Sequence, residues 1–157
     1  MPDYQPDNLF AKIVKGDIPS YKVYEDDKAI AFLDIMPRTP GHTLVIPKKG
    51  ARNLLDASPD DLAHVMKIAQ KVAQASMKVF GADGVTLQQF NEPAGGQVIF
   101  HLHVHVIGRE RPTVRGDRSE PVCAGRAETH LRLRCNGFSV NHGAQVGIEL
   151  NLAGTTI

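Results

Sequence analysis

The residues best suited to chemistry are three histidines that alternate with apolar residues in the run Phe100-His101-Leu102-His103-Val104-His105-Val106-Ile107. Successive side chains of a β-strand point to opposite faces, so these imidazoles would share one face at intervals of about 6.5 Å. An imidazole can ligate a metal, move a proton or attack as a nucleophile near neutral pH. A polar strand face that merely happens to contain histidine is a poor explanation for three in strict alternation. We therefore expect a functional site on this strand.

Two kinds of site fit the three histidines, a metal site and a phosphorus site. Alternating histidines can reach one metal ion, or one imidazole can attack phosphorus while its neighbours donate hydrogen bonds. The preceding Gly95-Gly96-Gln97 has backbone that can approach an anion with free N–H groups. A metal site would usually include a nearby carboxylate or thiolate, and Glu92 is the only one within nine residues on the N-terminal side. We favour the phosphorus site, with no bound metal and no cofactor.

Two helices are expected around this strand. A short one covers residues 9–14, capped by Asp7 or Asn8 and ended by Gly16. A long one begins after the cap Ser58 and continues to Gly81. Its apolar residues recur at helical spacing, and we assign all of them to the core: Leu62, Val65, Met66, Ala69, Val72, Ala73, Met77 and Phe80.

Five strands are expected from alternating or β-branched runs bounded by turn residues, over residues 21–25, 29–33, 42–47, 85–91 and 99–107. Strands that follow one another around a single long helix indicate an α+β fold with a mainly antiparallel sheet. The apolar face of the last strand, carrying Leu102, Val104 and Val106, would pack against the long helix.

The composition is that of a globular domain. The 157 residues have a formal net charge of +1, and 42% of them are apolar. Such a composition excludes disordered and membrane-spanning classes, and near-zero charge argues against nucleic-acid or anionic-membrane partners. The N-terminus lacks a signal-peptide pattern, and two cysteines are too few for a disulfide framework. We therefore expect a cytoplasmic protein.

The chain divides into two unlike parts. All nine lysines lie between Lys12 and Lys78, whereas the residues after Gly108 contain seven arginines and no lysine. We predict a domain over residues 1–108 and an atypical tail over residues 109–157. The tail is either the product of a shifted reading frame or fusion, in which case disorder follows, or a divergent native extension.

Five motifs in residues 7–108 resemble the histidine-triad (HIT) family of nucleotide hydrolases and transferases, in its Hint-like branch. The resemblance implies a HIT-like α+β fold: a mainly antiparallel five-stranded sheet with one long and one short helix, joined to a second sheet across a homodimer. The motifs are Asp7-Asn-Leu-Phe-Ala-Lys-Ile-Val with Ile18-Pro19, Ala31-Phe-Leu-Asp-Ile-Met-Pro, Pro40-Gly-His-Thr-Leu-Val-Ile-Pro-Lys, Asn91-Glu-Pro-Ala-Gly-Gly-Gln and His101-x-His-x-His.

The resemblance also implies catalytic roles. His103 matches the nucleophile that attacks the α-phosphorus of a purine nucleoside phosphoramidate or related adenylate, giving a nucleotidyl-histidine that water hydrolyses. His105 matches the donor to the phosphoryl oxygens, and His101 and His42 match histidines that orient the nucleophile. Asp34 matches the carboxylate that accepts both ribose hydroxyls, which implies a ribonucleotide.

The remaining implied contacts surround the nucleotide. The apolar slot for the base matches Leu9, Phe10, Ile13, Phe32 and Ile35, although each is equally suited to the core. The phosphate-side contacts match Asn91, Gly96, Gln97 and Val98.

Three departures from the family pattern bear on function. Some members bind structural zinc through cysteines and a histidine at positions that match Asn8, Ala11 and Gly50, so we predict no zinc here. Val98 replaces a serine of the phosphoramidase branch and has no hydrogen-bond donor for the leaving group. The family pattern also stops after Gly108. The alternatives are therefore a dinucleoside polyphosphate hydrolase, or a purine nucleotide-binding module with weak or vestigial catalysis.

Overall fold

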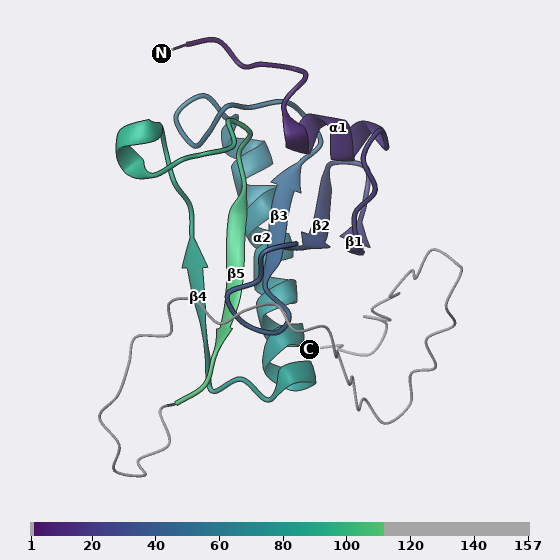
Figure 1. Cartoon of the computed structure of the whole chain (residues 1–157), viewed down its shortest axis with the longest axis vertical. Helices are drawn as coiled ribbons and strands as arrows, with labels where there is room; N and C mark the ends of the chain where they lie inside the picture. The colour runs from purple at the N-terminus through teal and green to yellow at the C-terminus, as the bar shows by residue number, and fades with distance from the viewer. Residues whose placement is uncertain (1, 112–157) are drawn as a thin grey trace. The chain divides into compact units, whose positions relative to one another are not determined.

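The structure is a computed structural model that describes residues 2–111. The described residues form five strands and two helices, and Figure 1 shows how these are arranged. The helices are α1 (Leu9–Lys15) and α2 (Pro59–Phe80), and a short 3-10 turn, η1, covers Pro93–Gly95. The strands are β1 (Lys22–Glu25), β2 (Ala29–Leu33), β3 (Thr43–Pro47), β4 (Gly84–Gln88) and β5 (Val104–Arg109).

All five strands form one antiparallel sheet in the order β1-β2-β3-β5-β4. The last strand therefore inserts between β3 and the edge strand β4 (Figure 1). The expected α+β fold with one long and one short helix is confirmed. Because β5 has a neighbouring strand on each side, the segment that leads into it lies in the interior of the domain, where His101 and His103 are buried.

Both helices begin and end where the sequence predicts. The Asn8 side chain accepts a hydrogen bond from the N–H of Ala11 at 3.0 Å and so caps α1. The Ser58 hydroxyl accepts from the N–H of Asp61 at 3.2 Å and caps α2. Gly16 and Gly81 end the helices with positive φ angles of 86° and 65°, a conformation that glycine adopts without strain.

Each face of the sheet carries its own apolar core, because neighbouring strand residues point to opposite sides. One cluster contains Ala29, Ala31 and Val45 with Val104 and Val106, packed against α2. The other cluster takes the alternate strand positions and packs them against α1: Phe10, Ile13, Ile30, Phe32, Leu44 and Ile46. His103 and His105 therefore lie on the α1 side of the sheet.

The apolar face of α2 is narrower than predicted. The buried apolar residues of the helix are Val65, Ile68, Ala69 and Val72. The exposed fraction of the side chain is 46% for Met66, 39% for Met77 and 38% for Phe80. Assignment of the whole stripe to the core was therefore wrong for these side chains, because the sheet covers only one side of the helix. Exposed apolar residues remain on α2 after the domain has folded.

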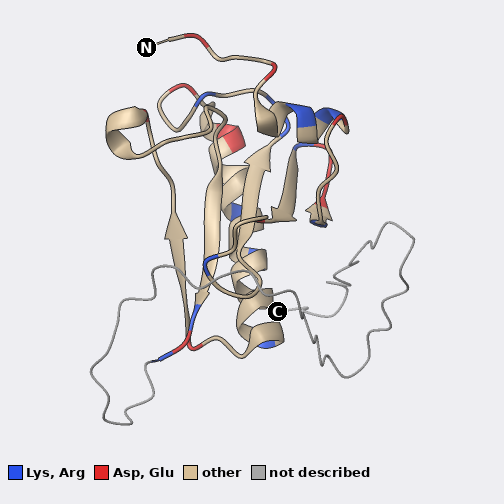
Figure 2. Ribbon diagram, in the orientation of Figure 1, with Lys and Arg blue, Asp and Glu red and all other residues tan. Residues whose placement is uncertain are grey.

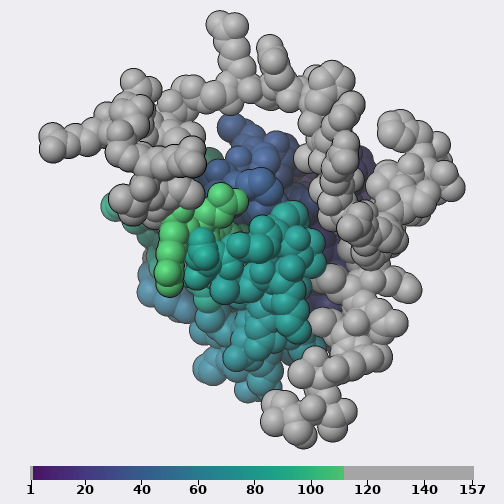
Figure 3. Space-filling view, turned by 90° about the horizontal axis from the view of Figure 1, so that it is seen from below, coloured from purple at the N-terminus to yellow at the C-terminus, as the bar shows by residue number. Residues whose placement is uncertain are grey.

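Glycine lets the end of β5 approach the end of α2. A Cβ at Gly108 would lie 3.1 Å from the Ser76 hydroxyl oxygen and 3.3 Å from the Ala82 Cβ. Figure 3 shows the two ends side by side, α2 in teal and β5 in green. A side chain at position 108 would therefore require Ser76 and Ala82 to give way by a few tenths of an ångström.

The fifth strand begins at Val104, not at Ile99 as predicted. The ladder pairs Val45 with Val104, so its continuation would set Pro47 opposite Leu102. Proline has no N–H to continue the ladder, and Leu102 instead donates to the carbonyl of Ala51 at 2.8 Å. His101 and His103 therefore lie in an irregular segment, and only His105 lies on the strand.

Several other strand boundaries differ from the prediction by one to three residues. β3 begins at Thr43, just after His42, and β4 ends at Gln88 where the prediction extended to Asn91. Figure 2 shows that the central strands are almost free of charged residues. In the described part of the chain, neither helix has the length and apolar content to cross a membrane. The predicted tail from residue 112 onward lies outside the described residues.

Candidate active site

The side chain of His103 is held by one short hydrogen bond. Its Nδ1 lies 2.6 Å from the backbone carbonyl oxygen of His101. A carbonyl can only accept, so Nδ1 carries the proton and Nε2 keeps its lone pair. The ring of Phe10 packs edge-on against this imidazole at a centroid distance of 5.1 Å. His103 is therefore fixed in the tautomer whose Nε2 can act as a nucleophile.

His101 is fully buried and has partners at both ring nitrogens. Nε2 donates to the carbonyl oxygen of Pro47 at 2.9 Å. Nδ1 is therefore the acceptor, and the hydroxyl of Tyr4 donates to it at 2.8 Å. His101 cannot offer a free nitrogen to a substrate, and its backbone carbonyl is what orients His103.

His42 and His105 form a second imidazole pair. Nε2 of His42 lies 3.0 Å from Nδ1 of His105. The N–H of Arg38, which can only donate, points to Nδ1 of His42 at 3.3 Å. This contact makes Nδ1 the acceptor, so His42 donates through Nε2 and His105 carries its proton on its own Nε2. His105 thus presents an N–H donor beyond the pair, and its ring lies 5.0 Å from that of His103.

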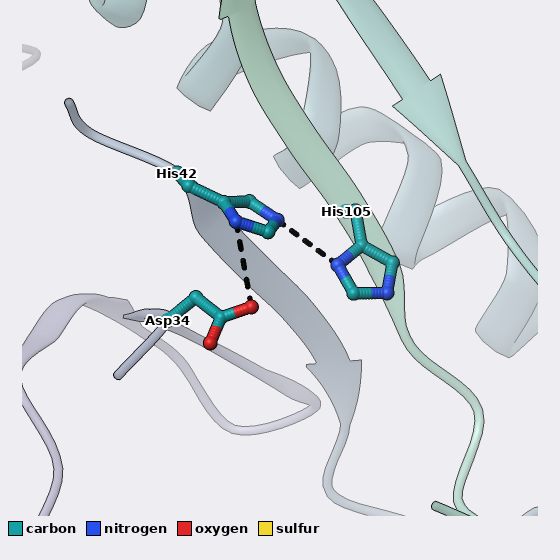
Figure 4. A group of neighbouring side chains, drawn as sticks. All are labelled: Asp34, His42 and His105. Carbon is teal, nitrogen blue, oxygen red and sulfur yellow. Dashed lines mark hydrogen bonds and ion pairs between the residues drawn. The ribbon is translucent and has the colours of Figure 1, made fainter. Parts of the chain in front are cut away.

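Asp34 lies at the other side of His42 (Figure 4). One carboxylate oxygen is 3.4 Å from Nδ1 of His42, and the other accepts the N–H of Met36 at 2.9 Å. Ligand atoms of Asp34, His42 and His105 lie within 4.8 Å of one another, a donor set that suits a transition metal. However, Asp34 and His105 approach opposite nitrogens of His42, so a shared ion would have to break the 3.0 Å imidazole bond. In the observed geometry the two histidines are hydrogen-bonded to each other, and the Asp34 carboxylate lies beside Nδ1 of His42.

Burial keeps these imidazoles neutral. Desolvation lowers the pKa of His101, His103 and His42 below the usual value. Desolvation also lowers the pKa of His105 to about 4, and the neighbouring His103 and His42 act in the same direction. Neutral rings at physiological pH leave a lone pair on His103 and an N–H donor on His105.

The residues predicted to line the slot for the base fall into two groups, one buried in the core and one exposed at the surface. Phe10, Ile13 and Phe32 belong to the buried cluster on the α1 side of the sheet. Leu9 is 41% exposed, and Ile35, directly after Asp34, is 83% exposed. Only Leu9 and Ile35 therefore present a large free apolar surface, and Phe10 serves mainly to pack against His103.

The loop before the triad differs from the prediction of free N–H groups. Those of Gly95, Gly96 and Gln97 all donate to carbonyls of Glu92 or Pro93 at 3.0 Å. The Gln97 amide is buried, and both its oxygen and its nitrogen bond within the protein. The Gln97 side chain therefore holds the loop together through its own hydrogen bonds, and its role at a phosphate stays a prediction.

Two other predicted phosphate-side residues lie on the same loop. The Asn91 side chain accepts the N–H of Leu54 at 3.0 Å and also pairs with Gln89. Val98 is 80% exposed. The loop thus presents an apolar side chain at the position that the resemblance gives to the leaving group.

Sequence reasoning missed the group that holds this loop. Arg52 donates twice to the carboxylate of Glu92, at 2.7 and 2.9 Å, and its guanidinium stacks 3.9 Å above the ring of Phe100. The Asn53 amide bridges Glu92 and Gln97 at 2.8 and 3.1 Å. Glu92 has a φ of 60°, which is unusual for a residue with a side chain. Arg52 belongs to no periodic pattern in the sequence. Only the position of Glu92 between two motif residues could have drawn attention to this pair.

Comparison with known proteins identifies the family to which this chain is similar. The model of the HIT domain matches residues 15–112 of the chain. A HIT-like protein of Bartonella henselae, described as involved in cell-cycle regulation and solved with an unknown ligand, has 57% sequence identity and a TM-score of 0.69. The alignment covers 69% of this chain and 84% of that one.

Two further relatives carry chemical information in their names. A zinc-bound histidine-triad family protein of Mycobacterium smegmatis is 36% identical, with a TM-score of 0.66 and coverage of 73% of this chain and 84% of that one. The adenylylsulfatase HINT3 of Arabidopsis thaliana is 39% identical over 106 residues, which are 68% of this chain and 54% of the relative. The match of the domain model over most of the chain, together with these similarities, shows that the chain belongs to the HIT domain family.

Proposed function

We propose that this protein is a nucleotidyl hydrolase or transferase that cleaves the bond between the α-phosphorus and its leaving group in purine nucleoside phosphoramidates or related adenylates. Membership of the HIT family supports a nucleotide-binding hydrolase or transferase in general. The observation that carries the finer proposal is the 2.6 Å bond from Nδ1 of His103 to a carbonyl, which leaves Nε2 free to attack.

The reaction proceeds in two in-line displacements. Nε2 of His103 forms a bond to the α-phosphorus while the bond to the leaving group breaks, which leaves a positively charged nucleotidyl-imidazole that keeps its Nδ1 proton. An amine leaving group takes a proton from solvent, whereas a carboxylate or sulfate leaves as the anion. Water then attacks the phosphorus of the nucleotidyl-histidine and releases the nucleoside monophosphate and a proton, restoring neutral His103. The N–H at Nε2 of His105 donates to a phosphoryl oxygen, where negative charge develops in both steps.

Asp34 is proposed to bind the ribose. Each carboxylate oxygen has two lone pairs, so the bond from the N–H of Met36 leaves capacity for two ribose hydroxyls. Leu9 and Ile35 would contact the base through their exposed side chains. Asn91 and Gly96 would border the phosphate, and Val98 the leaving group.

A substrate panel tests the proposed reaction. Adenosine 5′-phosphoramidate, an acyl adenylate, an adenylyl sulfate and a diadenosine polyphosphate would be compared for wild type and His103→Asn. We expect turnover of at least one monoadenylate and a loss of kcat on the order of 10³-fold or more in the variant. Equal turnover by the variant would refute the covalent mechanism. Nucleotide binding without turnover by wild type would favour a binding module, and preference for the diadenosine compound would favour the polyphosphate hydrolase.

We also propose a homodimer joined at β4. This strand lies at the edge of the sheet, and Leu87 on it is 42% exposed. Met66 and Met77 are exposed on α2, which packs against β4. An edge strand with apolar neighbours is suited to pairing with a second copy.

A further inference from the structure

The zinc found in some family members does not fit the residues of this chain. The positions that match the zinc ligands hold Asn8, Ala11 and Gly50, which offer no thiolate or imidazole. The ring of Tyr4 fills the space beside one of them: a Cβ at Gly50 would lie 2.8 Å from Cζ of Tyr4 and would also overlap its Cε1. A tyrosine therefore stands where a side chain at position 50 would have to be.

Tyr4 also makes the contact that fixes His101. Its hydroxyl lies 2.8 Å from Nδ1 of His101, and the two rings pack edge-on at 5.6 Å. The other nitrogen of His101 donates to the carbonyl of Pro47, so the imidazole needs a donor at Nδ1. Burial raises the pKa of the Tyr4 phenol, which therefore keeps its proton and can donate at neutral pH.

The contact continues to the proposed nucleophile. The His101 carbonyl accepts the 2.6 Å bond from Nδ1 of His103. Rotation of the His101 ring and backbone would therefore move the carbonyl that keeps the proton of His103 on Nδ1. Tyr4 lies before residue 15, where the match to the HIT domain model begins. Figure 1 shows the purple N-terminal segment crossing the end of the domain at which β3 ends.

We infer that Tyr4 is a positioning residue that holds His101, and through it His103, by a hydrogen bond in place of a metal ligand. The phenol and Gly50 act as a pair: the glycine leaves room for the ring, and the ring supplies the donor. The kinetic consequence rests on the proposed function, whereas the effect on His101 does not depend on it.

The test compares full-length wild type with Tyr4→Phe, which keeps the ring and removes the hydroxyl. Nitrogen NMR of the histidine rings is expected to show a changed Nδ1 resonance for His101 with its Nε2 still protonated. We expect kcat to fall about two- to tenfold, the cost of one hydrogen bond, with KM little changed. Tyr21→Phe is the matched control, since Tyr21 is 68% exposed and its phenol has no hydrogen bond within residues 2–111; it should change neither quantity.

A second pair of variants tests the partnership with Gly50. In wild type, Gly50→Ala should displace the Tyr4 ring and reproduce the His101 signature. In a Tyr4→Ala background the same substitution should have no further effect, because the ring is gone. An equal effect of Gly50→Ala in both backgrounds would overturn the inference, as would an unchanged His101 resonance in Tyr4→Phe.

Elemental analysis of the purified protein tests whether the Tyr4 hydroxyl or a metal ion holds His101. We expect no stoichiometric zinc, and no change in the His101 resonances on treatment with a chelator. One zinc per chain whose removal shifts those resonances would overturn the inference. If the variants show the NMR effects but the wild type turns over no nucleotide, the proposed function is refuted and the role of Tyr4 stands.

Discussion

At the scale of single residues, two backbone carbonyls decide the protonation pattern of the site. The carbonyl of His101 fixes the proton of His103 on Nδ1, and that of Pro47 fixes the proton of His101 on Nε2. The sequence identified the histidines because of their spacing. It could not reveal these tautomers, which depend on carbonyl groups that every residue carries.

The lowered pKa values predict the pH dependence of activity. Protonation of His103 would remove the nucleophilic lone pair, and desolvation lowers its pKa. The acid limb of kcat/KM should therefore lie below the usual histidine value of about 6.5. The measurement is kcat/KM between pH 5 and 8 with a substrate that does not titrate in this range. A limb at or above pH 6.5 would contradict the assignment.

Stability should follow the same groups. The unfolded chain protonates His105 near its ordinary pKa, whereas the folded chain does so only near 4. The unfolded state thus binds more protons between these values, and the free energy of unfolding should fall as pH decreases from about 6.5 to 4. Urea unfolding at a series of pH values measures this. In His105→Asn the slope should be shallower, and an unchanged slope would speak against the lowered pKa.

At the scale of elements, the sequence predicted both helices and the order of the strands because caps, glycines and apolar spacing mark them locally. It placed the start of β5 too early because the alternation of residues 99–107 continues past the point where Pro47 ends the ladder. The Arg52–Glu92 pair was not foreseen either, since it joins two loops that are forty residues apart.

The Arg52–Glu92 pair should be essential for the loop before the triad. Arg52→Met removes the donors that hold the Glu92 carboxylate and offset the cost of its positive φ. We expect Tm to fall by several degrees and kcat/KM to fall with it. The control is Lys22→Met, which breaks the exposed pair with Glu25 and should change Tm little. Equal effects of the two variants would show that the pair does not organise the site.

Gly108 should be needed for the contact between β5 and α2. Gly108→Ala places a Cβ against Ser76 and Ala82, and overpacking of this kind costs about 1–3 kcal/mol. Removal of the Ser76 hydroxyl, which is buried without a hydrogen-bond partner among the described residues, should restore part of this loss in Gly108→Ala/Ser76→Ala. Gly95→Ala is the control, because a Cβ there meets nothing within 4 Å. Chemical unfolding of these variants and of the single variant Ser76→Ala checks the contact, and full additivity of the two substitutions would refute it.

At the scale of the whole molecule, the proposed domain over residues 1–108 and the proposed dimer are the two open expectations. The HIT domain match ends at residue 112, and β5 ends at Arg109. The composition change after Gly108 is visible in the sequence alone, but composition does not tell a shifted frame from a divergent extension. Sequencing of the gene with its neighbouring frames distinguishes the two.

If two copies pair through β4, a charged side chain introduced on this strand should disrupt the dimer. Leu87→Asp introduces a charge on β4 and should convert a dimer to a monomer in light scattering coupled to size-exclusion chromatography. Tyr21→Asp places a charge at a more exposed position beside the opposite edge of the sheet and should leave the dimer unchanged. A monomeric wild type, or equal effects of both variants, would refute pairing through β4.

The central claim is that His103 takes up the nucleotidyl group before water does. It is tested most directly by the stereochemistry of hydrolysis of an adenosine phosphoramidothioate, chiral at phosphorus, in water labelled with ¹⁸O. Two in-line displacements each invert the phosphorus, so the account predicts net retention of configuration in the product. Net inversion would show direct attack by water and would contradict the nucleotidyl-histidine intermediate.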